Sequence, residues 1–152
     1  MISVELLHHT PIEIVAIATA EPYNSKPSEG LVERVFVTGH RSIARHSIAV
    51  FRIKDISQSA LRQLSRHPHI NLTVGSTRYI DMSNTSTYTP STFKGREDMK
   101  KVYEDAINNA MKSYRELKRM ENEYDLKDIS KLVLPLASTT HLTLSGNCQA
   151  LS

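Results

Sequence analysis

The chain has 152 residues, of which 39% are hydrophobic and 23% are charged, as is ordinary for a soluble globular protein with a hydrophobic core. Its 19 Lys and Arg against 16 Asp and Glu give a net charge of +3, far from the strongly basic balance of nucleic-acid-binding proteins. There is no apolar run of roughly 18 residues to span a membrane, and no secretory signal pattern. One cysteine, Cys148, excludes an internal disulfide. We expect a single cytoplasmic domain over residues 1–152.

The first segments predict two strands and a helix. Ser3–Leu7 and Ile12–Ala18 are short runs rich in β-branched residues, separated by Pro11, and such runs are typical of strands. After a turn rich in Pro, Asn and Ser, Ser28 can cap the N-terminus of a helix over Gly30–Thr38. These elements indicate a domain that mixes strands and helices.

The middle of the chain predicts a strand, a helix and a long loop. Ser47–Ile53 approaches the alternation of a half-buried strand. Ser57 can cap a helix that runs to about His67, where Pro68 ends it. Asp81–Lys94 is rich in Ser, Thr and Asn, and long loops inside compact domains are often functional or mobile.

The clearest element is an amphipathic helix over Glu97–Asn122, where apolar residues recur at spacings of three and four. We assign its Met and Tyr stripe to the core or to a subunit interface. Asp128–Leu134 indicates a short helix, Thr139–Leu144 a strand, and Ser145–Asn147 the start of another helix. The order predicts an α+β (α/β) domain with a mixed or antiparallel sheet and flanking helices, the long helix packing outside the sheet.

Positive charge is concentrated between Gly39 and Tyr79. This window holds seven Lys or Arg and four His against a single acid, Asp55. A segment of one sign indicates a binding site for an anion, most commonly phosphate. Arg62 and Arg66 share a helix face at i, i+4, where an anion between them would offset their repulsion. The alternative is a solvated face, because cations are favoured at a helix C-terminus.

The stretch from Arg66 to Tyr79 resembles the signature of the flavin-dependent thymidylate synthases. That signature is Arg-His-Arg, seven residues, a Ser and, two residues later, Arg-Tyr. The same spacing separates Arg66-His67-Pro68 from Ser76 and Arg78-Tyr79. Further segments are similar to the family's in the same order: Tyr23–Leu31, Gly39–Ser42 with His46, Leu134–Leu136, Thr139-Thr140 and Asn147.

The resemblance implies both an activity and a site. Members of this family methylate dUMP to dTMP with methylenetetrahydrofolate and with FAD that NADPH reduces, and they are homotetramers. Carried over by position, the cofactor-binding residues are His40, Ser42, Arg66 and His67. The dUMP-binding residues are Gln63, Ser76, Arg78 and His141; Ser76 and Arg78 position or activate the substrate near its phosphate, and Gly75 allows close approach to the backbone. No metal is implied.

Four positions depart from the family's pattern. Pro68, His141 and Gln149 stand where the family has Arg, and Val74 stands where it has Glu. The sequence also stops before the family's next helix. Each lost charge-assisted contact costs about 1.5–3 kcal/mol of binding. Three hypotheses follow: an active enzyme, an impaired homologue that binds flavin or pyrimidine nucleotide or assembles with a complete partner, and a small nucleic-acid-binding protein.

Overall fold

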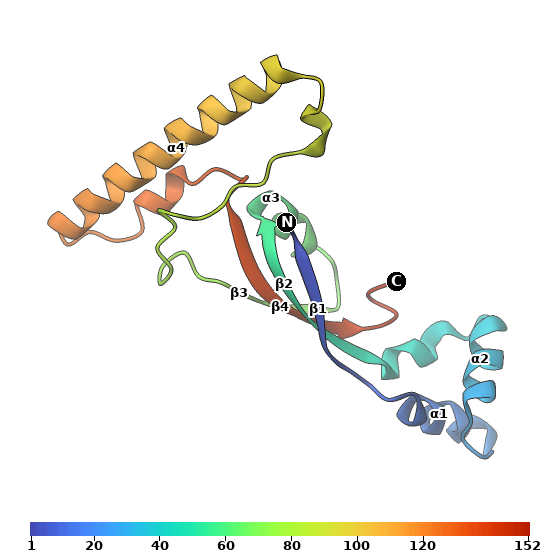
Figure 1. The fold of residues 1–152 in the computed structure, drawn as a ribbon. Helices are drawn as coiled ribbons and strands as arrows, with labels where there is room; N and C mark the ends of the chain where they lie inside the picture. Colours follow the sequence, from blue (N-terminus) through green and yellow to red (C-terminus); the bar gives the residue numbers. More distant parts are fainter. The chain divides into compact units, whose positions relative to one another are not determined.

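The computed structural model describes every residue from Met1 to Ser152, and its elements are labelled in Figure 1. The strands are β1 (Ser3–His9), β2 (Ile48–Ser57), β3 (Ile70–Val74) and β4 (Thr139–Asn147). The α-helices are α1 (Ile12–Ala20), α2 (Glu29–Val37), α3 (Gln58–Leu64) and α4 (Glu97–Glu123). Short 3-10 helices are η1 (Glu21–Tyr23), η2 (Arg41–His46), η3 (Ser91–Phe93) and η4 (Ser130–Val133). None of the helices combines the length and apolar character needed to cross a membrane.

The four strands form one sheet in the order β1-β2-β4-β3. Past one end of the central pair, Gln58 N donates to Ser138 O at 2.9 Å, and at the other end Cys148 N donates to Ser47 O at 2.7 Å. The residue numbers rise along β2 as they fall along β4, so the two strands are antiparallel. The outer pairs, β1 with β2 and β3 with β4, are also antiparallel. Thr10 N donates to Ile48 O beside the first pair, and Gly75 N donates to His141 O beside the second. The predicted α+β class is confirmed, and the sheet is antiparallel.

The chain divides into two compact units. The α4 unit comprises Met1–Ile2, Lys54–Leu64 and Val74–His141. The α1–α2 unit comprises Ser3–Ile53, Ser65–Thr73 and Leu142–Ser152. β2, β3 and β4 each contribute residues to both units. One domain over residues 1–152 stays a prediction.

In the α1–α2 unit, the predicted strand over Ile12–Ala18 is wrong, because this segment forms α1. The buried residues of α1 lie at helical spacing on one face: Val15, Ala16, Thr19 and Ala20. Three alanines favour a helix, and burial of this face against α2 outweighs the β propensity of the isoleucines and valine. The apolar core of the unit gathers Ala20, Leu31 and Val35, with Ile43 packed against it.

The predicted N-caps are confirmed, whereas several element limits shift. Ser28 Oγ accepts a hydrogen bond from Leu31 N at 3.2 Å, and Ser57 Oγ accepts one from Ala60 N at 3.1 Å. α3 ends at Leu64, earlier than predicted. β4 continues through Ser145 to Asn147, where a helix had been expected to begin. β3 was not predicted, although its sequence Ile-Asn-Leu-Thr-Val alternates between half-buried apolar residues and exposed polar residues, as a strand with one covered face does.

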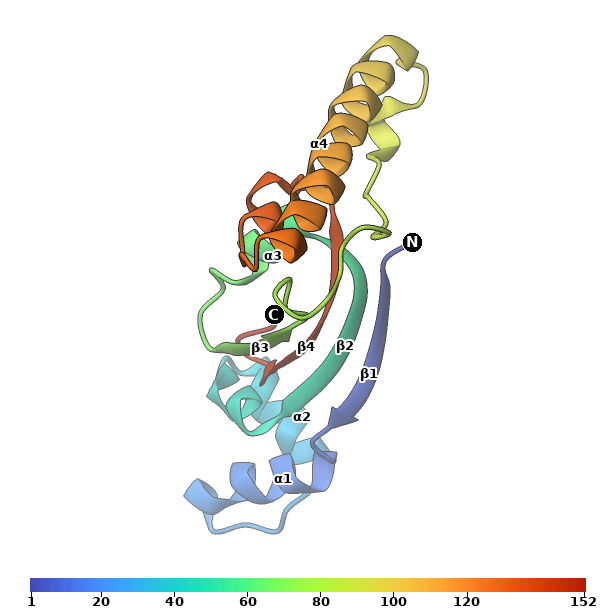
Figure 2. The same cartoon turned by 90° about the vertical axis from the view of Figure 1, so that its left-hand side faces the viewer.

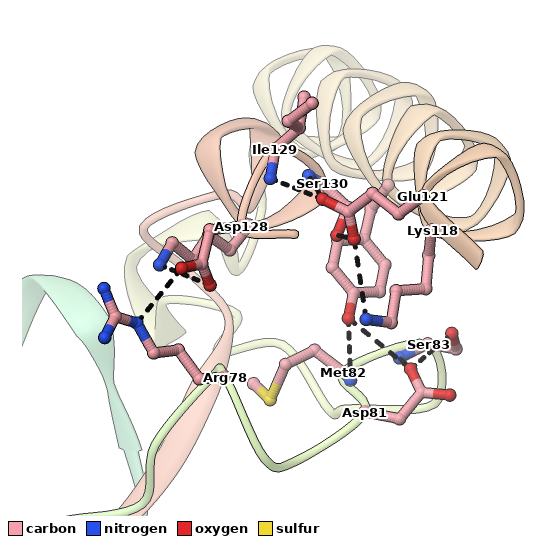
Figure 3. Close-up of polar contacts among 11 residues, drawn as sticks. Arg78, Asp81, Met82, Ser83, Lys118, Glu121, Asp128, Ile129 and Ser130 are labelled. Carbon is pink, nitrogen blue, oxygen red and sulfur yellow. Dashed lines mark hydrogen bonds and ion pairs between the residues drawn. The ribbon is translucent and has the colours of Figure 1, made fainter. Parts of the chain in front are cut away.

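In the α4 unit, the predicted long helix is confirmed and buries Met111 and Tyr114. The Tyr114 hydroxyl accepts a hydrogen bond from Met82 N at 3.1 Å, which fixes the loop that follows β3 (Figure 3). Other residues of the same apolar stripe are exposed, including Met99 and Val102. The middle of α4 therefore packs in the core, whereas apolar side chains near the start of the helix remain exposed.

A buried carboxylate ties the end of α4 to η4 (Figure 3). The Glu121 side chain is 3% exposed and accepts hydrogen bonds from Ser130 N at 2.6 Å, from Ser130 Oγ at 2.8 Å and from Ile129 N. Lys118 Nζ lies 3.5 Å from Glu121 Oε2. Burial alone would raise the pKa of Glu121, but the hydrogen bonds outweigh burial and lower its pKa. The ionised carboxylate therefore holds the start of η4 in place.

The space beside Gly75 is filled by other side chains. A Cβ built on Gly75 would lie 2.9 Å from His141 Cε1 and 3.1 Å from Ile80 Cδ1. Gly75 N also donates to His141 O at 2.9 Å, so the backbone of β4 and the imidazole both meet this residue. Gly75 was expected to let a phosphate approach the backbone, but the His141 ring occupies the space beside it.

Replacing Glu121 by Gln should lower the free energy of unfolding at neutral pH by about 1–3 kcal/mol. Both carboxylate oxygens of Glu121 accept hydrogen bonds from Ile129 and Ser130, whereas the NH2 group of a glutamine can only donate. The pKa of Glu121 is lower in the folded protein than in the unfolded chain. The stabilisation is therefore fully present at pH values above the unfolded pKa and is lost as the pH falls through the folded pKa. Denaturant unfolding of both proteins across the acidic range measures it. Glu116→Gln, at an exposed position of α4, is the control. A difference that does not vary with pH would contradict this role.

Replacing Gly75 by Ala should destabilise the protein by about 1–3 kcal/mol, since the new methyl group overlaps the His141 ring. Adding His141→Ala should restore most of the loss in thermal or denaturant unfolding. Gly30→Ala is the matched control: a Cβ there meets nothing within 4 Å, and in a helix it should stabilise by about 0.5–1 kcal/mol. An equal loss with and without His141 would show that the ring is not the obstacle.

Candidate functional site

The residues predicted to bind cofactor and those predicted to bind substrate belong to different compact units. The cofactor set His40, Ser42, Arg66 and His67 lies in the α1–α2 unit. The substrate set Gln63, Ser76, Arg78 and His141 lies in the α4 unit. Each set is therefore built by the packing of its own unit.

The α1–α2 unit contains a cavity of about 510 Å³, the Arg45 cavity. It is lined by Arg45, His67, Pro68, His69, Asn147, Gln149, Ala150 and Ser152. Of the predicted cofactor set, only His67 lines this cavity. The other three side chains, those of His40, Ser42 and Arg66, are exposed.

Hydrogen bonds fix the wall of the Arg45 cavity that follows β4. Asn147 Oδ1 accepts from Ala150 N at 2.9 Å, which closes a turn at the end of the strand. His67 Nε2 hydrogen-bonds the carbonyl oxygen of Ala150. Across the cavity mouth, Arg45 Nε donates to Gln149 Oε1 at 2.6 Å. No local sequence pattern indicates the Arg45–Gln149 pair, because its two residues lie far apart along the chain.

The predicted substrate residues Ser76 and Arg78 lie on one tight turn of the α4 unit. Ser76 Oγ accepts a hydrogen bond from Arg78 N at 3.3 Å. Ser76 O accepts from Tyr79 N at 3.1 Å and from Ile80 N at 3.0 Å. The half-buried serine thus orders the turn, and the exposed guanidinium of Arg78 extends from it.

Arg78 is held by an acid that sequence analysis missed. Arg78 Nε lies 3.2 Å from Asp128 Oδ2, and Lys131 Nζ lies 2.8 Å from Asp128 Oδ1 (Figure 3). The hydrogen bond from Lys131 lowers the pKa of Asp128, burial opposes this effect, and the Arg78 charge adds to it. Asp128 has a positive φ of 70°, a backbone conformation that Asp adopts more readily than most residues. An ionised Asp128 therefore orients Arg78.

The Arg78 cavity, of about 340 Å³, surrounds this ion pair. It is lined by Thr77, Arg78, Tyr79, Lys118, Glu121, Lys127, Asp128, Ser130 and Lys131. Four cations thus face two carboxylates, and the excess positive charge suits an anionic group such as a phosphate. The three lysines are distant in sequence from the motif, so only the fold reveals them.

The other two predicted substrate residues lie apart from the Arg78 cavity. His141 lines a different cavity of about 520 Å³, the His141 cavity, together with Lys54, Asp55, Ile80, Asp81, Met82, Asn84, Thr85, Ser86, Thr139 and Thr140. Gln63 is exposed on α3 and lines neither of these two cavities. The unit brings Ser76 and Arg78 together and leaves Gln63 and His141 outside that group.

Comparison with known proteins places these features in a family. The sequence profile of the family described as thymidylate synthase complementing protein matches residues 5–152. A flavin-dependent thymidylate synthase of Helicobacter pylori is 30% identical over 162 residues, which cover 95% of this chain and 77% of the relative. A probable flavin-dependent thymidylate synthase of Mycobacterium phage D29 is 27% identical over 139 residues, so that 84% of this chain spans 59% of the relative.

Solved structures agree with the sequence comparisons. The crystal structure of thymidylate synthase X from Helicobacter pylori with FAD and dUMP has a TM-score of 0.72 and 25% sequence identity. The similarity covers 99% of this chain and 80% of that protein. Taken with the profile match over nearly the whole sequence, this likeness shows that the chain is a divergent member of the thymidylate synthase complementing protein family, the flavin-dependent thymidylate synthases.

Proposed function

We propose that the assembled protein methylates dUMP to dTMP, with methylenetetrahydrofolate as carbon donor, FAD as cofactor and NADPH as reductant. The observation that carries this proposal is the Arg78 cavity, where an arginine on a serine-capped turn lies among an excess of cations. The relatives named as flavin-dependent thymidylate synthases, one of them solved with FAD and dUMP, support the choice of reaction.

In this proposal the dUMP phosphate binds at the Ser76–Arg78 turn. A guanidinium and nearby lysines suit a dianionic phosphate, because each hydrogen bond is charge-assisted. The phosphate would compete with Asp128 for Arg78, so binding exchanges one anionic partner for another. Asp128 keeps its second cation, Lys131, after the exchange. Gln63 and His141 are proposed to contact the rest of the nucleotide.

The donor set of the Arg45 cavity fits an anionic cofactor. The guanidinium of Arg45 and the amide group of Asn147 supply hydrogen-bond donors there, and no Asp or Glu side chain lines the cavity. We assign His67, with His40, Ser42 and Arg66, to FAD binding. Reduced FAD supplies the hydride for the reaction when it is bound, and the chain's own residues hold and orient it.

Assembly into a homotetramer in the cytoplasm is part of the proposal. Every residue of β1 is exposed, including Val4 and Leu6. Met99 of α4 is 54% exposed and Val102 is 71% exposed. Apolar surface of this kind marks protein interfaces more often than free surface. A family member of this type builds its active site from several chains, which would bring the two sets of site residues of different copies together.

The reaction itself is tested with the purified protein. We expect a yellow protein with flavin absorption bands that releases tritium from 5-tritiated dUMP when NADPH and methylenetetrahydrofolate are added. Colourless protein that takes up no added FAD would contradict the flavin part of the proposal. Binding of FAD and dUMP without tritium release would instead identify an impaired homologue.

Arg78→Ala should weaken dUMP binding by about 10- to 100-fold, since a charge-assisted contact of about 1.5–3 kcal/mol is removed. Isothermal titration with dUMP measures the change. Arg119→Ala is the matched control, because Arg119 has a similar exposure, 68% against 66%, and is also paired with a carboxylate, that of Glu123 at 3.0 Å. Equal affinities in the two variants would exclude Arg78 from the phosphate site.

A further inference from the structure

The Arg45 cavity differs from the other cavities in its charge. Its lining residues include one arginine and two histidines but no Asp or Glu side chain. The Arg78 cavity contains Glu121 and Asp128, and the His141 cavity contains Asp55 and Asp81. A fourth cavity, beside Met1, also contains Asp55. No acidic side chain in the walls of the Arg45 cavity therefore offsets the charge of its arginine, which favours an anionic ligand.

Arg45 is oriented by a neutral partner, so no neighbouring negative charge offsets its positive charge. Its Nε donates to the amide oxygen of Gln149 at 2.6 Å, and this is the one hydrogen bond of its side chain. Three other arginines are paired with carboxylates: Arg52 with Glu5, Arg78 with Asp128 and Arg119 with Glu123. A neutral acceptor on Nε leaves both terminal nitrogens of Arg45 as donors, and these form the fork that binds phosphate oxygens.

The partner that orients Arg45 is itself held in place. Cys148, next to Gln149, donates its backbone N–H to Ser47 O at 2.7 Å and its Sγ lies 3.1 Å from Ser47 Oγ. The turn that carries Gln149 is thereby fastened next to the segment that follows η2, the helix that carries Arg45. The Arg45–Gln149 contact therefore belongs to two anchored segments, which reduces the entropic cost of holding a long side chain in one position.

We propose that Arg45 binds a phosphate group of FAD in the Arg45 cavity and that Gln149 positions the guanidinium of Arg45. This inference rests on the proposed function. This assignment gives the cavity a cation although Pro68 and Gln149 supply none. The chemistry is the recognition of a pyrophosphate by a guanidinium oriented through its Nε, beside the imidazole of His67.

The test is a titration of FAD into the assembled protein, followed by quenching of flavin fluorescence at fixed ionic strength. Arg45→Gln should raise the Kd of FAD about 10- to 100-fold, whereas Gln149→Ala should raise it less because only the orientation is lost. The Kd of dUMP, measured on the same Arg45→Gln protein, should not change. The matched control is Arg52→Gln, an exposed arginine of the same unit, which should leave both constants within about twofold.

Each other outcome has a definite meaning. FAD affinity in Arg45→Gln equal to that of Arg52→Gln overturns the role of Arg45 while leaving the proposed function intact. A loss of dUMP affinity with unchanged FAD affinity also overturns it, since the cavity would then take the substrate. A wild-type protein that binds no FAD overturns this inference and the flavin part of the proposed function together. Unfolding midpoints matching the wild type establish that the variants are folded.

Discussion

The buried carboxylate of Glu121 is the interaction on which the Arg78 cavity depends. It gathers the backbone N–H groups of Ile129 and Ser130 into one acceptor and so fixes the residues next to Asp128. Asp128 in turn is the ion-pair partner that orients Arg78. A single charge at the end of α4 thus helps to set the position of the arginine that we propose to bind phosphate, without Glu121 itself touching the substrate.

The two arginines proposed to bind phosphate differ in the charge of the partner that orients them. Arg78 begins in an ion pair, so a ligand must displace a carboxylate and gains only the difference between two anionic partners. Arg45 begins with a neutral amide partner, so a phosphate adds to an interaction that can persist. The substrate, which must leave as product in every cycle, would thus be bound with the smaller net gain and the cofactor with the larger.

Much of the fold could be predicted from local sequence patterns. The caps at Ser28 and Ser57 and the long α4 were predicted, because capping and helical spacing act within a few residues. α1 was missed because its apolar face against α2, not its β-branched composition, decides its conformation. β3 was missed because its segment was interpreted only through the spacing of its motif, and its alternation of apolar and polar residues was not used.

The candidate site was predictable only where it depends on spacing along the chain. The motif located Ser76 and Arg78 on one turn, but neither Asp128 nor the Arg45–Gln149 pair has a signal in the local sequence. The same limit applies to β1, whose open edge is visible only in the sheet order. All its residues are exposed, so its unpaired backbone groups and apolar side chains can accept a strand from any extended chain. A partner strand or a second copy that covered this edge would remove this route to aggregation.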